Sequence, residues 1–204
     1  SEDGERFATT GWDQRLALRG ADGSLLGRTQ GVHIGAPRAL DVASSGALAA
    51  AVYQGGGVLV LTVDAAVDAA VDAGGGRDGS RRGSRRGSLT VDGATVVAAG
   101  PAGRLLAVGD DQGQVHVFEA VASPEGPSFR VSLKPLWSGG PEPGERQPGR
   151  GAAAVTDLTF SPDGSRLLAS SRERWIDEWA AASGDPAGPG RQVLGQRRVR
   201  YLPD

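Results

Sequence analysis

The residues best suited to chemistry are few in this chain of 204 amino acids. It has two histidines, His33 and His116, and no cysteine. Neither histidine has a second histidine or a carboxylate cluster beside it at metal-ligand spacing. The chain also lacks a G-x-S-x-G elbow and a glycine-rich phosphate loop ending in Lys-Ser/Thr. We therefore predict no catalytic, cofactor or metal site and no enzyme, while a Ser-His-Asp set drawn from distant segments stays open.

Two further groups of polar residues have the spacing of known sites. Asp110 and Asp111 lie in GDDQGQ, where capping of a hairpin turn accounts for both acids. The tract RRGSRRGS ends at Ser88, and its two Arg-Arg-Gly-Ser units resemble the Arg-Arg-x-Ser consensus of basophilic kinases. Ser84 and Ser88 are therefore candidate phosphorylation sites, each phosphate adding about −1.5 to −2 charges.

Two other interpretations of the arginine-rich tract stay open. Arginine and glycine runs contact single-stranded RNA, although residues 77–88 contain no aromatic side chain for base stacking. A plain surface linker is the third interpretation. Residues 74–88 and 138–150 contain too few apolar side chains to offset the entropy of ordering, so we expect both to lack stable structure.

The elements that position these residues follow from one recurring pattern. Residues 155–179 read VTDLTFSPDGSRLLASSRERWIDEW. Two alternating runs flank a Ser-Pro-Asp-Gly turn, in which proline presets φ, aspartate caps the backbone and glycine accepts positive φ. A third run closes on Trp179, so the segment predicts an antiparallel meander of strands.

The same turn returns along the chain. Its glycine is Gly4, Gly46, Gly103 and Gly164, at intervals of 42, 57 and 61 residues. The first interval is a bare repeat, and the two longer ones contain insertions at about 64–88 and 138–150. Segment 129–137, FRVSLKPLW, alternates as an outer strand does, and we expect Trp137 to pack rather than to bind. RQVL at 191–194 can supply a further outer strand. Val199, Tyr201 and Leu202 follow it and begin the next blade, dock on a neighbour or belong to a surface tail.

These repeats resemble those of the WD40 family, through FSPDG, LLAS and I-x-x-W in the fourth repeat and V-x-V-F in the third. The resemblance implies an all-β fold, a β-propeller over 1–204 with about three complete blades and one partial blade that lacks its opening strand. It also implies an arc of a seven-bladed ring. The residues at the family's structural positions are His33 thirteen residues before Gly46, the hairpin aspartates Asp13 and Asp111, with Glu173 in the fourth repeat, and the closing aromatics Phe118 and Trp179.

Composition limits the partners. The net charge is −2, so the chain as a whole does not attract nucleic acid. No apolar run is long enough to span a membrane, and no signal-peptide pattern is present, so we predict no membrane contact. The absence of cysteine fits a reducing, intracellular setting, cytoplasmic or nuclear. The chain begins with Ser1 and contains no methionine, which indicates a processed product or an internal piece of a longer protein.

We expect a non-catalytic scaffold that binds other protein subunits of a multiprotein complex. Two alternatives remain: a propeller subunit of an RNA-associated complex, and a propeller accessory to a hydrolase, since the SPDG turn also occurs in propellers resembling TolB. The aromatic residues that close the third and fourth repeats favour the WD40 interpretation.

Overall fold

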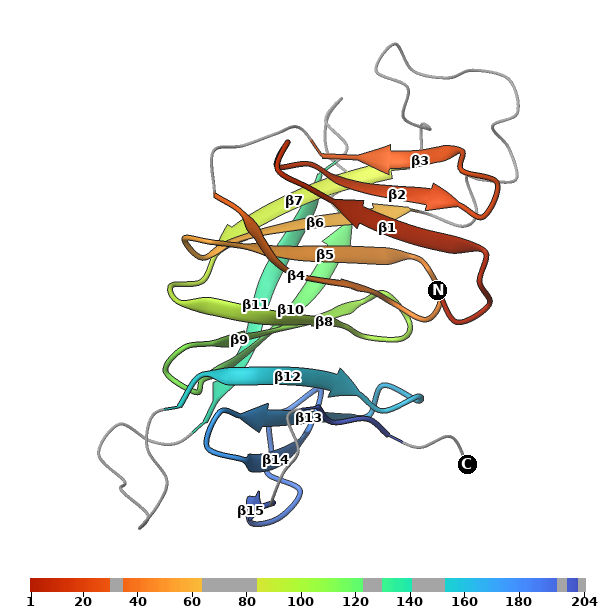
Figure 1. The fold of residues 1–204 in the computed structure, drawn as a ribbon. Helices are drawn as coiled ribbons and strands as arrows, with labels where there is room; N and C mark the ends of the chain where they lie inside the picture. The colour runs from red at the N-terminus through yellow and green to blue at the C-terminus, as the bar shows by residue number, and fades with distance from the viewer. Residues whose placement is uncertain (30–34, 64–83, 123–129, 141–152, 194–197, 202–204) are drawn as a thin grey trace.

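The computed structural model describes residues 1–29, 35–63, 84–122, 130–140, 153–193 and 198–201, and in these ranges it consists of strands and turns without a helix (Figure 1). The strands form four antiparallel sheets that stack in chain order, from the red sheet to the blue one. We call them blades 1 to 4. Blade 1 holds β1 (Arg6–Thr10), β2 (Leu16–Gly20) and β3 (Leu25–Arg28).

The other three blades have four strands each, in the sheet order of a simple meander. Blade 2 holds β4 (Pro37–Val42), β5 (Leu48–Tyr53), β6 (Gly57–Val63) and β7 (Ser84–Thr90). Blade 3 holds β8 (Ala94–Ala99), β9 (Leu105–Asp110), β10 (Val115–Ala122) and β11 (Val131–Gly139). Blade 4 holds β12 (Val155–Phe160), β13 (Arg166–Ser171), β14 (Trp175–Ala180) and β15 (Arg191–Gln192).

The four turns with the recurring glycine have one hydrogen-bonding pattern. The glycine N–H donates to the carbonyl three residues earlier at 2.7–3.1 Å, and φ is between 68° and 73° at Gly4, Gly46, Gly103 and Gly164. This left-handed conformation is accessible to glycine without a steric cost. A second bond of 2.6–3.0 Å closes each turn, from the nitrogen of Ser1, Ala43, Gly100 or Ser161 to the carbonyl of Arg6, Leu48, Leu105 or Arg166.

These equivalent turns fix the correspondence between blades. β1 comes directly after the turn at Gly4, as β5, β9 and β13 come after the equivalent turns of the other blades. β1 therefore corresponds to the second strand of a complete blade. The inner strands of the complete blades are β4, β8 and β12, and β4 and β12 lie on either side of β8. Blade 1 has no inner strand in the described residues, as expected from the repeat pattern.

The core lies between the blades. One apolar cluster joins blades 1 and 2, a second joins blades 2 and 3, and a third joins blades 3 and 4. β5 contributes to two of them, since its side chains alternate and all six residues of LAAAVY are buried. Alanines in this strand allow the neighbouring sheets to approach closely, and burial of the apolar faces drives the stacking.

The expectation of disorder over residues 74–88 is wrong for its last five residues. Residues 84–88 lie in β7, which pairs with β6 from Ser84↔Val63 to Thr90↔Gly57. Composition predicted disorder because it does not include the backbone hydrogen bonds that β6 provides to this segment. The position at the edge of the sheet also leaves the long arginine side chains access to solvent. Residues 74–83 lie outside the described residues.

The second insertion also has more order at its start than expected. Ser138 and Gly139 of the segment 138–150 end β11, which pairs with β10, and residues 141–150 lie outside the described residues. β11 confirms the predicted outer strand within 129–137, although Phe129 itself is not described. β15 confirms the first half of the outer strand predicted at 191–194, and Leu194 is not described.

Candidate functional site

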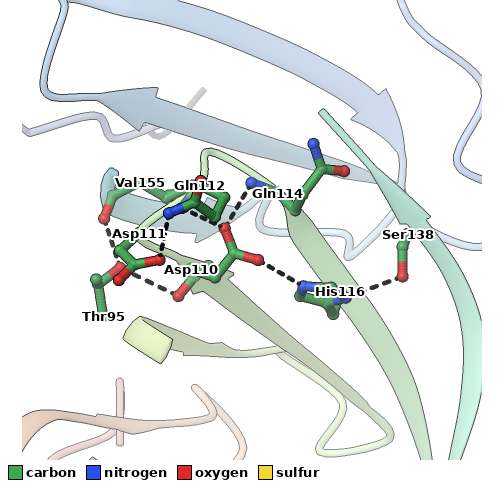
Figure 2. Close-up of polar contacts among 9 residues, drawn as sticks. Thr95, Asp110, Asp111, Gln112, Gln114, His116, Ser138 and Val155 are labelled. Carbon is green, nitrogen blue, oxygen red and sulfur yellow. Dashed lines mark hydrogen bonds and ion pairs between the residues drawn. The ribbon is translucent and has the colours of Figure 1, made fainter. Parts of the chain in front are cut away.

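A chain of hydrogen bonds at one end of blade 3 connects a carboxylate, an imidazole and a hydroxyl (Figure 2). Asp110 Oδ2 lies 3.0 Å from His116 Nε2, and His116 Nδ1 lies 3.0 Å from Ser138 Oγ. The three residues come from β9, β10 and β11. Asp110 has 8% of its side chain exposed and His116 has 26%, whereas Ser138 lies at the surface.

Asp110 holds the hairpin between β9 and β10. Its Oδ1 accepts hydrogen bonds from the backbone N–H groups of Gln112 at 2.9 Å and Gln114 at 2.8 Å. The reverse turn also requires positive φ at Gly113, which is 83°. The other carboxylate oxygen is thereby directed at His116. Asp110 thus uses both carboxylate oxygens, one for the backbone of the hairpin turn and one for His116 on β10.

The turn-capping role expected for the two neighbouring acids falls to Asp110. Asp111, which the repeat comparison placed at the family's aspartate position, lies exposed and accepts a bond from the Gln112 side chain at 3.0 Å. The one-residue difference arises because Asp110 is the last residue of β9 and its side chain turns inward. Asp13 in blade 1 is exposed and accepts a 3.3 Å bond from the N–H of Arg15.

This row of groups allows two interpretations, one catalytic and one structural. A hydroxyl, an imidazole and a carboxylate in a row are the components of a nucleophile, its base and the acid that orients the base. Here the serine faces Nδ1 and the aspartate faces Nε2. His116 and Ser138 are also direct partners in the β10–β11 register, so the same bonds tie three strands together. Every contact in the network is accounted for by this second, structural role.

The sequence reasoning missed the Asp110–His116 pair. Six residues separate the two, and they meet because the hairpin folds the chain back on itself. The usable signal was the position of both residues on opposite arms of a predicted turn. His33, the other histidine, lies outside the described residues.

A second polar contact joins blade 3 to blade 4. Thr95 Oγ1 donates to the carbonyl of Val155 at 2.7 Å and lies 3.1 Å from the carbonyl of Gly109. A Cβ at Gly109 would lie 2.6 Å from the side chain of Val155. Glycine is thus needed at this position so that β12 can approach β9 closely.

The closing aromatic residues lie in the packing between blades. Trp179 has 7% of its surface exposed, and its ring centroid is 5.9 Å from that of Trp137. Trp137 donates from Nε1 to the carbonyl of Ala181 at 2.9 Å, which confirms its packing role. Phe118 packs against the cluster between blades 2 and 3.

The geometry defines the class of protein. Four stacked antiparallel meanders, with inner strands side by side and apolar clusters between the sheets, are consecutive blades of a β-propeller. The β-propeller domain of Cps50 (Swd1) from Myceliophteria thermophila superposes with a TM-score of 0.62 at 13% sequence identity. The match covers 98% of this chain and 56% of that one, so the chain spans little more than half the length of the similar domain. No family model and no curated protein matches the sequence.

The described residues also limit two other kinds of site. They hold no group of three or more His, Cys, Asp or Glu side chains arranged for a metal ion. They also hold no helix long and apolar enough to cross a membrane.

Proposed function

We propose that the chain is a WD40-like propeller segment that acts as a non-catalytic scaffold and binds another protein through loops at one end of its blades. The sequence features behind the family assignment are I-x-x-W in blade 4 and V-x-V-F in blade 3. Four blades over 56% of the similar domain correspond to about seven blades of equal length, which fits an arc of a seven-bladed ring.

One observation carries the proposal. Trp12 has 84% of its surface exposed in the hairpin between β1 and β2. Tryptophan is rarely left in water, and it is enriched among the residues that dominate binding energy at protein interfaces. The corresponding hairpin of blade 3 holds the Asp110–His116 network, so the same end of the blades offers an apolar anchor and an ordered polar surface.

The alternatives have less support from the described residues. The polar set around His116 is committed to hydrogen bonds between strands, which favours a scaffold over a hydrolytic centre. The arginine-rich tract enters β7 and has no aromatic neighbour in its sequence for base stacking, which favours a protein partner over RNA.

Affinity capture from a native extract with the 1–204 chain tests the proposal. We expect a discrete protein partner at defined stoichiometry, and binding reduced by about tenfold or more in Trp12→Ala, as for a central hot-spot residue. Leu136→Ala is the matched control, because Leu136 is also exposed, at 42%, but lies on outer strand β11. Equal binding by wild type and Trp12→Ala would contradict the assignment of this hairpin. RNA that copurifies at high salt would support the RNA-associated alternative instead.

A further inference from the structure

β7 is the outermost strand of blade 2 and contains the second Arg-Arg-Gly-Ser unit. It pairs along its length with β6, and the sheet ends there. On the outward side, the described residues show one bridge, between the backbones of Arg86 and Arg130. A strand at the edge of a sheet is paired along its length on one side only, so it separates from the sheet more easily than a strand paired on both sides.

The register of β7 places its side chains on two faces. Ser88 and Arg86 lie opposite Leu59 and Leu61, which belong to the cluster between blades 1 and 2. Leu89 lies opposite Val58 and packs on the cluster between blades 2 and 3. Alternation therefore puts Arg85 on the face of Leu89, and Ser88 on the face of Arg86.

Ser88 has the exposure that a modification site needs. Its side chain is exposed at the outer edge of blade 2, while Arg85 and Arg86 are half-buried. A phosphate at this position would extend into solvent, with the Arg86 guanidinium two residues away on the same face of the strand. Such a pair forms charge-assisted hydrogen bonds, so the modified strand can return to the sheet.

We propose that Ser88 is a phosphorylation site for an arginine-directed protein kinase, and that β7 must separate from β6 before the kinase can act. A kinase that recognises both arginines together with the serine needs the segment as a free extended strand. In the folded sheet Arg85 faces blade 3 while Ser88 faces blade 1, so one active site cannot reach both. The inference is independent of the scaffold function proposed above.

The reaction is an ordinary phosphoryl transfer from a nucleoside triphosphate. Ser88 Oγ attacks the γ-phosphorus, a new O–P bond forms, and the bond from that phosphorus to the β,γ-bridging oxygen breaks. The nucleoside diphosphate leaves, and the hydroxyl proton passes to the kinase base. The result adds about −1.5 to −2 charges to an edge that carries two arginines.

The test compares the full chain with a synthetic peptide spanning residues 82–92, both carrying Ser84→Ala so that Ser88 is the acceptor. Each is incubated with ATP, Mg²⁺ and a kinase of Arg-Arg-x-Ser specificity, and phosphate on Ser88 is located by mass spectrometry. We expect modification of the chain at a rate at least about tenfold below that of the peptide, because only the opened fraction reacts.

Two truncations separate opening from general loss of stability. Val58→Ala removes the β6 contact of Leu89 and should raise the rate in the chain several-fold. Val117→Ala, an equally buried residue in blade 3, is the matched control and should leave the rate unchanged. Absence of phosphate from Ser88 in both the wild-type chain and Val58→Ala, while the peptide is modified, would overturn the site. Equal rates for chain and peptide would overturn the requirement for opening.

Discussion

The carboxylate of Asp157 on the inner strand of blade 4 accepts a 2.8 Å hydrogen bond from the backbone N–H of Val199, 42 residues later in the chain. Asp41 on the inner strand of blade 2 accepts the same kind of bond from Ala99 on the inner strand of blade 3, also at 2.8 Å. Val199 has 6% of its surface exposed. Residues 198–201 therefore contact blade 4 as one inner strand contacts the blade before it.

Loss of the Asp157 carboxylate should weaken this contact. Asp157→Ala leaves the N–H of Val199 without its partner in a buried position, and we expect a loss of about 1–3 kcal/mol in the free energy of unfolding. Asp157→Asn keeps an acceptor oxygen and removes the 3.1 Å ion pair with Arg200, whose side chain is 61% exposed, so its cost should be smaller. Chemical denaturation of the three proteins measures the difference, and equal stability of Asp157→Ala and wild type would show that the segment does not contribute.

Asp41 should make stability depend on pH in the acid range. Burial raises the pKa of the Asp41 carboxyl above the ordinary value of 3.8, although the hydrogen bond from the Ala99 N–H acts in the opposite direction. Because the folded pKa is raised, the stability linked to this group is fully present below pH 3.8 and is lost as pH rises through the folded pKa. Asp41→Asn keeps the acceptor without the charge.

We therefore expect Asp41→Asn to match wild type near pH 3.5 and to exceed it in thermal midpoint near pH 7. Asp41→Ala, which removes the acceptor, should be less stable than Asp41→Asn at both pH values by about 1–3 kcal/mol. A constant difference between Asp41→Asn and wild type across this range would contradict the raised pKa.

Asp163 should have the opposite pH dependence. The Ser161 hydroxyl, followed by the N–H and hydroxyl of Ser165, donates to its carboxylate and lowers the pKa to about 2. Its stabilising effect is present above pH 3.8 and is lost as pH falls through about 2. The thermal midpoints of wild type and Asp163→Asn should thus differ at pH 5 and converge near pH 2. Ser161→Ala, which removes the main donor, should reduce the effect of Asp163→Asn at pH 5.

Gly109 should not tolerate a side chain. Gly109→Ala forces β12 away from β9 through the contact with Val155, and we expect a loss of about 1–3 kcal/mol. Gly188→Ala is the control, because its Cβ would have no atom within 4 Å, and it should change stability by no more than about 0.5 kcal/mol. Guanidinium denaturation curves of both variants decide the matter, and similar midpoints would contradict the close approach of blades 3 and 4.

The paired tryptophans should differ in cost. Trp179→Ala removes a buried ring between blades 3 and 4 and should cost about 3–5 kcal/mol. Trp137→Phe retains an aromatic ring and loses the bond to the Ala181 carbonyl, for about 0.5–1.5 kcal/mol. Near-ultraviolet circular dichroism of the tryptophans should weaken in both variants, while the far-ultraviolet spectra keep the β signal. A smaller effect of Trp179→Ala than of Trp137→Phe would argue against the packing described.

The sequence by itself determined the strands and turns. Alternating apolar residues identify the inner strands. The recurring glycines mark the turn before the second strand of each blade, because glycine adopts positive φ without a steric cost. The 42-residue interval between Gly4 and Gly46 set the repeat length. The repeat pattern also predicted a first blade without an inner strand, and blade 1 has none in the residues that the structure describes.

Only the tertiary structure decided which polar residues meet. The bond between Asp157 and Val199 and the pairing of residues 84–88 with β6 depend on chain that is remote in sequence. The approach of Asp110 to His116 depends on the geometry of the hairpin that joins their strands. Composition predicted disorder for that tract because it contains no apolar side chain of its own, but a strand edge stabilises the backbone whatever the side chains are. The exposure of Trp12 likewise depends on which surfaces the assembled blades leave uncovered, and no local pattern contains that information.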